Sequence, residues 1–266
     1  MDGPVCKRPD RIYDGAMNTS SVLTRIYCDA DLGAGWTVAL GPGPAHKLRT
    51  VLRAKPGDDI LVFNGRDGEW RTRLNDIGKT KVLAECREQA RPQHDEPGPW
   101  LAFAPLKKDR MDHLVEKAVE MGVERLIPVI TRRTENRRVK LERLTQQIID
   151  AAEQCERLTL PALGAPVELK NLPAMWPHER VLLVAAERRH AHPLPYVLGG
   201  EHHALGLLVG PEGGFEPNEL DWLLDLPISK PVNLGPRILR AESAAIAGLS
   251  VIQALSGDWA AHNEKI

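Results

Sequence analysis

One pattern occurs twice in residues 205–257: a short apolar run, a glycine-proline turn and a helical segment. The first run, 205–209, is too short and too closely flanked by glycine for a helix, so it predicts a buried parallel strand. The turn 210–214 (GPEGG) then leads into a helix over 216–226. The second copy comprises a strand over 231–234, a turn over 235–237 and a helix over 239–255 that is closed by Gly257.

The two turns predict a ligand site. In open α/β folds, ligands bind in a crevice at the carboxyl ends of parallel strands. The alternative is that GPEGG only connects two elements, as a lone glycine loop commonly does. The second turn, however, is followed by Arg237, Arg240 and Glu242, and buried strand ends rarely carry so much charge without a ligand. Neither turn matches the Walker pattern or G-x-G-x-x-G, so phosphate and dinucleotide binding are disfavoured.

The segments VGPEGGF (209–215) and NLGPRILRAESA (233–244) resemble the carboxyl-terminal signature of the SPOUT-class RNA methyltransferases, and more narrowly the RsmE family. That family methylates N3 of one uridine in small-subunit ribosomal RNA. The resemblance implies a trefoil-knotted parallel sheet with helices on both faces, bound S-adenosylmethionine and a homodimer. The chain departs from the family's usual ILRTETA at Ala241, which lacks a hydroxyl, and at Ser243, which keeps one.

The resemblance also implies roles for single residues. Loop backbone around the two turns would hold the cofactor, because glycine permits close approach. The candidates for cofactor binding are Val209, Gly210, Glu212, Gly213, Gly214, Leu234, Gly235, Ile238, Leu239 and Ser243. Arg240 is the candidate for stabilising charge on the uridine carbonyl oxygens as N3 loses its proton. Glu242 is the candidate proton acceptor, or alternatively the residue that positions Arg240.

Composition agrees with an RNA-binding enzyme only once charge is divided along the chain. The net charge is −1, but residues 20–92 carry 12 Lys and Arg against 9 Asp and Glu, whereas 161–266 carry 8 against 12. The RNA footprint is therefore expected away from the cofactor crevice. The four cysteines are scattered, and no apolar run approaches membrane-spanning length. We expect a protein of the reducing cytoplasm, with no metal and no membrane contact.

The amino-terminal part predicts a polar disordered tail over 1–21 and a small, mostly antiparallel β unit over 22–92. Its expected strands are 24–28, 36–40, 59–63, 69–74 and 79–86, with hairpin turns at 64–65 and 67–68 and a helical turn at 46–53 after a break at Pro42–Pro44. The related family carries a PUA-like RNA-binding domain here, so Arg25, His46 and Arg53 are candidate RNA contacts.

A proline-rich linker over 93–99 separates this unit from the second domain, 100–266. The second domain opens with a strand over 100–104, a helix capped by Asp109 and ending at Gly122, and a strand over 124–130. Residues 131–143 then hold six basic side chains against two acidic ones. Arg132, Arg133, Arg137 and Arg138 are candidate RNA contacts, and the alternative is a solvated helix start. Neutralising these four is expected to weaken RNA binding and to leave cofactor affinity unchanged.

Two further groups of residues have more than one interpretation. The segment 153–157 resembles the family's A-x-E-Q-x-x-R element, which implies that Gln154 and Arg157 lie near the active site. From the residues alone, Arg157 is a cation at a helix carboxyl end. His190, His192, His202 and His203 suggest zinc, but their spacing fits no structural zinc pattern, and histidines of surface loops are the better interpretation.

The sequence therefore predicts an S-adenosylmethionine-dependent methyltransferase that acts on a uridine of small-subunit ribosomal RNA, with an assembled subunit as the expected partner. Three alternatives stay open at this point. The chain would be a ribose 2'-O-methyltransferase of the same class, a non-catalytic ribosome-assembly factor, or an enzyme that uses the same glycine loops on a small molecule.

Overall fold

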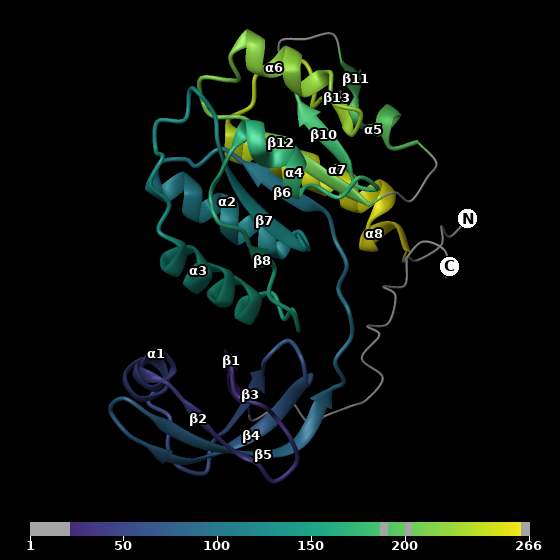
Figure 1. Ribbon diagram of the computed structural model, residues 1–266. Coiled ribbons are helices and arrows are strands. Elements are labelled where there is room, and N and C mark those ends of the chain that lie inside the picture. The colour runs from purple at the N-terminus through teal and green to yellow at the C-terminus, as the bar shows by residue number, and fades with distance from the viewer. Residues whose placement is uncertain (1–21, 187–190, 200–203, 262–266) are drawn as a thin grey trace, which may run out of the picture. The chain divides into compact units, whose positions relative to one another are not determined.

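The computed structural model describes residues 22–186, 191–199 and 204–261, which form two compact units (Figure 1). The first unit ends at Gln93 and the second begins at His94. The expected tail over 1–21 lies outside the described residues, as do His190, His202 and His203. Among the helices of the described ranges, none has the length and apolar content that crossing a bilayer requires.

The first unit is a five-stranded sheet in the order β1-β3-β4-β5-β2. Its strands are β1 (Val22–Tyr27), β2 (Thr37–Leu40), β3 (Asp59–Phe63), β4 (Glu69–Ile77) and β5 (Val82–Arg91). The pairs are antiparallel except β1 with β3. The mostly antiparallel β unit is confirmed, and both expected turns lie in the single connection between β3 and β4.

The expected break at the two prolines is wrong. Helix α1 (Pro42–His46) begins at Pro42, and a π-helical turn, η1 (Lys47–Val51), follows it without interruption. Proline disrupts a helix interior but suits the first turn, where its backbone needs no hydrogen to donate and its φ is already helical. The prolines therefore belong to the start of the helix and do not form a break before it.

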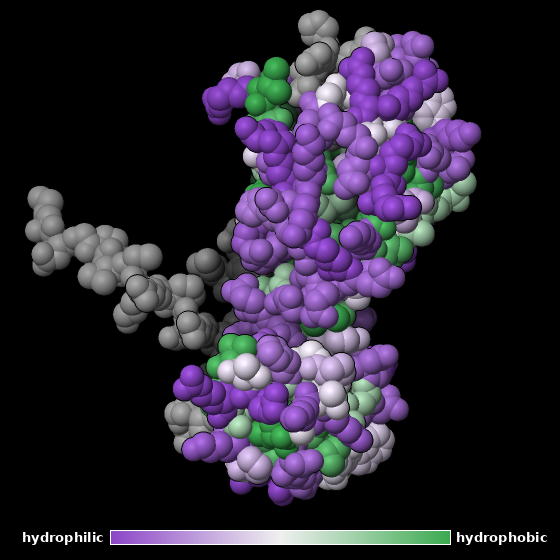
Figure 2. All heavy atoms as spheres, turned by 90° about the vertical axis from the view of Figure 1, so that its left-hand side faces the viewer, coloured by the Kyte–Doolittle hydropathy of each residue, from purple (hydrophilic) through white to green (hydrophobic). Residues whose placement is uncertain are grey.

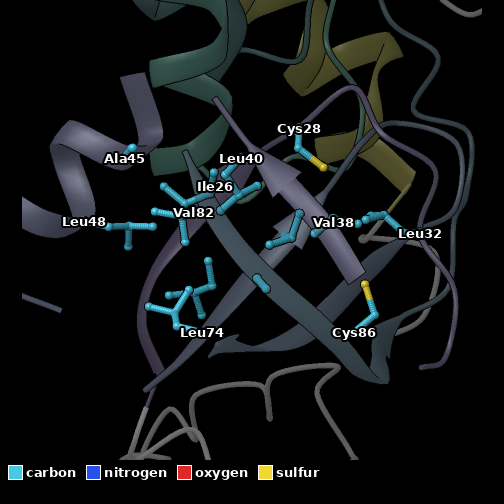
Figure 3. Close-up of a cluster of buried hydrophobic side chains, with 13 residues drawn as sticks. Ile26, Cys28, Leu32, Val38, Leu40, Ala45, Leu48, Leu74, Val82 and Cys86 are labelled. Carbon is cyan, nitrogen blue, oxygen red and sulfur yellow. The ribbon is translucent and has the colours of Figure 1, made fainter. Parts of the chain in front are cut away.

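The core of the first unit lies between the sheet and the helical turn, and it contains two cysteines (Figure 3). Ile26, Val38 and Leu74 from three strands pack in it, all at most 2% exposed. Cys28 and Cys86 are free thiols at its edge. Burial raises the pKa of Cys28 to about 11, and burial also raises the pKa of Cys86. Because the thiolate is the reactive form, these cysteines act as small apolar residues.

The second unit contains an eight-stranded sheet in the order β11-β13-β10-β12-β6-β7-β8, with β9 paired to β7. Its strands are β6 (Trp100–Phe103), β7 (Arg125–Ile130), β8 (Ala162–Leu163), β9 (Val167–Glu168), β10 (Val181–Ala185), β11 (His192–Pro193), β12 (Leu205–Val209) and β13 (Ser229–Asn233). Every pair is parallel. The carboxyl ends of the strands therefore share one edge.

Helices cover both faces of this sheet (Figure 1). They are α2 (Lys108–Glu120), α3 (Leu141–Gln154), η2 (Leu169–Asn171), α4 (Leu172–Met175), α5 (Leu194–Val197), α6 (Pro217–Leu224), α7 (Ala241–Ser256) and α8 (Asp258–Ala261). Successive side chains of β12 point to opposite faces of the sheet. Leu208 packs in the cluster that includes α4 and α6, whereas Leu207 contacts Gly248 of α7 on the other face.

Three local expectations are corrected. Asp109 is not the N-cap of α2, which is Lys107, although Asp109 does lie in the first turn. The basic run is mostly a loop over 131–140, because Thr131 and Thr134 bond to each other and hold a turn before α3 begins. No strand was expected over 161–177, but this region supplies β8 and β9, whose two residues each are too few to show periodicity.

Candidate active site

A pocket of about 290 Å³ lies over the carboxyl ends of β12, β10 and β13. Both glycine turns contribute to it, as expected, with β10 between their strands. All the candidate cofactor residues except Ser243 line it, as does Arg240. Ser243 is exposed on α7 and does not line the pocket, because the first turn of α7 directs Ala241 and Ala244 there instead.

The first loop is shaped by a close contact between Gly210 and Phe215. A β carbon at Gly210 would lie 2.9 Å from the Phe215 ring, so a larger residue there would displace the ring. The loop then enters α6 through a capping box, in which the backbone N–H of Glu216 donates to Glu219 Oε2 at 3.1 Å. These contacts hold the loop backbone toward the pocket.

The second loop is held by Asn233. The backbone N–H of Gly235 donates to Asn233 Oδ1 at 2.6 Å, and Gly235 has a φ of 115°, a conformation that L side chains rarely adopt. Apart from its chain neighbours, no atom of the described residues lies within 4 Å of the position that its β carbon would take. The loop therefore leaves open space where a side chain would otherwise stand.

Arg240 and Glu242 differ in their access to the pocket. Arg240 is the N-cap residue of α7, is exposed and lines the pocket. Glu242 is 9% exposed and does not line it. Glu242 Oε1 lies 3.7 Å from Arg110 Nε, and its Oε2 is buried with no hydrogen-bond partner in the described part of the chain. The carboxylate that lines the pocket is Glu212.

The sequence did not identify Arg110 as a site residue. Its Nη1 lies 3.6 Å from Glu212 Oε1, so its guanidinium joins the first loop to Glu242 on α7. The signal that could have found it is its place in the first turn of α2, the helix that follows β6 at the carboxyl edge of the sheet. Arg237 also lines the pocket and was noted only as a charge on the second turn.

The basic loop over 131–140 contacts the first glycine loop. Arg133 Nη1 donates to the backbone oxygen of Gly213 at 2.9 Å. The backbone N–H of Arg132 donates to Glu219 Oε1 at 2.8 Å, and its side chain pairs with Glu216. Arg133 is thus attached to the loop that lines the pocket, and Arg132 is attached to the start of α6, which follows that loop. The expectation that they act independently of cofactor binding does not fit these contacts.

The structure places Gln154 and Arg157 at the opposite edge of the sheet. Arg157 is 8% exposed and donates to the backbone oxygens of Val119 and Val123, at the carboxyl end of α2. It also pairs with Glu96, which precedes the amino end of β6. Since all strands are parallel, this cluster is remote from the glycine loops. Arg157 is therefore a structural cation, and exposed Gln154 lies at the same edge.

Glu96 completes that cluster from within the expected linker. Burial by itself raises the pKa of this carboxyl, but hydrogen bonds from Thr159 and the Leu158 backbone, with the charge of Arg157, outweigh it and hold the pKa below its usual range. Residues 94–99 of the expected linker are therefore part of the second unit, to which Glu96 anchors them.

In the first unit, the three candidate RNA contacts differ in exposure. Arg25 is 7% exposed, pairs with Glu69 and stacks on Phe63 with its guanidinium carbon 3.6 Å from the ring centroid. It stabilises the sheet and is not presented to a ligand, so this expectation is corrected. His46 and Arg53 are exposed, and Arg53 has a φ of 54°.

Comparison with known proteins gives concordant results. Residues 96–253 match the family model of the RNA methyltransferase domain, and 48–85 match that of the RNA methyltransferase PUA domain. The chain is 33% identical to the ribosomal RNA small subunit methyltransferase E of Rickettsia conorii over 234 residues, which cover 87% of this chain and 95% of the relative.

Solved structures agree. That of ribosomal RNA small subunit methyltransferase E from Neisseria gonorrhoeae bound to S-adenosyl methionine has a TM-score of 0.79 and 30% identity, covering 89% of this chain and 99% of that one. A methyltransferase from Legionella pneumophila, also in complex with the cofactor, has a TM-score of 0.77 and 28% identity, covering 88% and 97%. The mostly parallel, helix-covered sheet and its amino-terminal PUA domain are thus a SPOUT-class fold, and the chain belongs to the ribosomal RNA small subunit methyltransferase E family.

Proposed function

We infer that this protein transfers a methyl group from S-adenosylmethionine to small-subunit ribosomal RNA, and we assign the methylated atom to N3 of one uridine. The observation that carries the inference is the pocket at the carboxyl edge, built from the two glycine loops whose sequences carry the family signature. The ribosomal substrate supports a cytoplasmic site of action. An assembled subunit is the proposed form of the substrate.

The pocket suits S-adenosylmethionine, which supplies an electrophilic methyl group when bound. Val209, Leu220 and Leu239 provide apolar walls for a flat base such as adenine. Gly235 leaves room for close approach of a ligand to the backbone, because open space lies where its side chain would stand. Glu212 offers a carboxylate to the cationic parts of the cofactor.

The residues of the chain would then promote attack by the base. Methylation requires N3 of uridine to lose its proton, and negative charge then spreads onto the carbonyl oxygens. Arg240, exposed at the pocket, is placed to stabilise that charge. Glu242 is behind the pocket wall, so we assign it the positioning of Arg110 instead of proton transfer. Glu212 is then the carboxylate available to the proton.

The Arg133 contact predicts coupling between the basic loop and the cofactor. Arg133→Ala should lower S-adenosylmethionine affinity about 3- to 10-fold, because one charged hydrogen bond at a partly exposed site contributes ~1 kcal/mol to loop position. Calorimetric titration measures the affinity. Arg138→Ala is the matched control, since Arg138 belongs to the same basic loop but lines the second pocket and lacks the bond that Arg133 makes to Gly213. Equal affinity in the two variants would contradict the coupling.

The family resemblance supports a homodimer, and exposed apolar side chains of the second unit indicate where its interface lies. The small residues of α7 are accounted for within one chain, because α7 packs against both α2 and β12. Ala245 and Ile252 are each 1% exposed, so charging them would unfold the unit. Three large apolar side chains remain exposed on neighbouring helices: Tyr196 (82%), Leu255 (47%) and Trp259 (45%).

We therefore expect Leu255→Glu with Trp259→Glu to raise the dimer dissociation constant at least about 100-fold, since each such side chain contributes about 2 kcal/mol when buried. Light scattering over a concentration series measures the mass. Leu23→Glu with Trp36→Glu is the matched control, because this pair is also an exposed leucine and tryptophan but lies in the first unit. A double α7–α8 variant that stays dimeric would place the interface elsewhere.

The proposed reaction is tested on ribosomal RNA itself. Nucleosides from small subunits of a strain lacking the protein are compared by mass spectrometry with those of the parent strain and of a strain given the gene back. Loss and return of 3-methyluridine supports the proposal. Loss of a 2'-O-methylated nucleoside would assign the ribose reaction, and an unchanged nucleoside profile would assign a non-catalytic role. Turnover without RNA would favour a small-molecule substrate.

A further inference from the structure

A second pocket, of about 440 Å³, lies between the first turns of α2 and α3. Its apolar part consists of Leu106, Met111, Val139 and Leu144. Asn136 donates from Nδ2 to the backbone oxygen of Leu106 at 3.0 Å, which fixes the basic loop against the segment that follows β6. The pocket is therefore a formed feature of the carboxyl edge.

The charged side chains that line this pocket are all cationic: Lys108, Arg138, Lys140 and Arg143. Arg143 pairs with Asp112 of α2. Lys108, Arg138 and Lys140 are exposed and form no ion pair with any described residue. Like charges gather in this way where an anionic ligand is bound, because their mutual repulsion otherwise disfavours the arrangement.

The backbone adds to the positive potential. Helix α2 begins after Lys107 and α3 begins after Lys140, and neither N-cap residue makes a side-chain hydrogen bond to the helix. The first N–H groups of both helices thus lack the usual side-chain acceptor. Acidic residues do lie in the two first turns, Asp109 and Glu142, but neither lines the pocket.

The second pocket also lies next to the candidate active site along α2. Lys108 and Met111 line the second pocket, whereas Arg110 lines the first, so the first turn of α2 contributes to both pockets. The face of the unit that carries α2 and α3 has a mostly hydrophilic surface (Figure 2). An RNA strand whose target base enters the first pocket would have its neighbouring nucleotides near this face.

We propose that the second pocket holds a nucleotide flanking the methylated one, with its base against the apolar floor and its phosphates at the cationic rim. This assignment rests on the proposed function. Base stacking on apolar side chains and phosphate contacts with Lys and Arg are the two general terms in single-strand binding. The absence of any carboxylate from the described lining favours a nucleic acid over a protein partner.

The first test removes charge from the rim. Arg138→Gln with Lys140→Gln is compared with Lys170→Gln with Lys230→Gln, which removes the same charge from exposed residues of this unit that line neither pocket. The ligand is the small subunit purified from a strain lacking the protein. The pocket variant should weaken binding at least 10-fold and reduce the slope of log affinity against log salt by about 1.4 to 1.8, the value for two phosphate contacts.

The second test locates the nucleotide. A photoreactive benzoyl-phenylalanine at position 139 should cross-link to ribosomal RNA next to the methylated nucleotide or a few nucleotides away. Wild-type affinity and salt slope in the pocket variant, or a cross-link only to ribosomal protein, would overturn the assignment. Cofactor affinity should stay unchanged in both variants. A wild-type protein that binds the subunit but transfers no methyl group would refute the proposed function alone, because the binding results decide the pocket independently.

Discussion

Replacing Arg240 by alanine should lower kcat for methyl transfer by about 10²- to 10³-fold, the usual effect of removing one donor that stabilises transition-state charge. Arg240 is exposed at the pocket and has no ion-pair partner among the described residues, so its charge is available to a ligand. Its side chain makes no capping bond to α7, so the variant should fold normally. Single-turnover transfer to small subunits measures the chemical step.

The pattern of kinetic constants separates catalysis from binding. Loss of kcat with little change in KM or cofactor affinity indicates an interaction made in the transition state. Arg237→Ala is the matched control, because it removes the same charge from the same loop and pocket. Arg240→Lys should recover only part of the rate, since lysine keeps the charge but not the planar fork. Near-normal turnover in Arg240→Ala would refute the catalytic assignment.

Gly235→Val should abolish measurable binding of S-adenosylmethionine. Two effects combine at this position. Valine is strained at a φ of 115°, and its side chain would occupy the open space of the pocket. Steric exclusion from a site commonly costs several kcal/mol, and about 3 kcal/mol is already more than a 100-fold loss of affinity. Gly213 is a weaker choice for this test, because a β carbon there meets Arg133 only at 3.5 Å.

The strain itself must be separated from the loss of the site. Gly57→Val provides the control, because Gly57 also has a positive φ, 94°, and no atom within 4 Å of the β-carbon position, but lies in the first unit. Both variants should lose similar stability, about 1–2 kcal/mol in thermal or urea unfolding. Calorimetry should find the cofactor bound normally by Gly57→Val. Retained affinity in Gly235→Val would remove the cofactor from this pocket.

Local features of the sequence determined which loops and helices form the site. The apolar runs at β12 and β13 and the glycine-proline turns after them fixed two strand-loop-helix units, because turn chemistry and strand burial depend on neighbouring residues. The same local rules located Arg240 at the start of α7. The family signature indicated the cofactor and the reaction, which the hydrophobic periodicity of the sequence does not specify.

The tertiary structure alone decided which charged residues are available to a ligand. Arg25 and Arg157 are the same residue type as Arg240, and the sequence alone does not distinguish them from it. Both are buried with partners that lie 44 and 61 residues away in the sequence. Arg110 was overlooked for the same reason, since Glu242 comes beside it only when α2 and α7 pack. Long-range ion pairing decides whether an arginine side chain is available to a ligand. The free energy of a buried charge depends on that pairing and not on the local sequence. The strand order, which inserts β10 between the two signature strands, is likewise set by packing of the whole sheet.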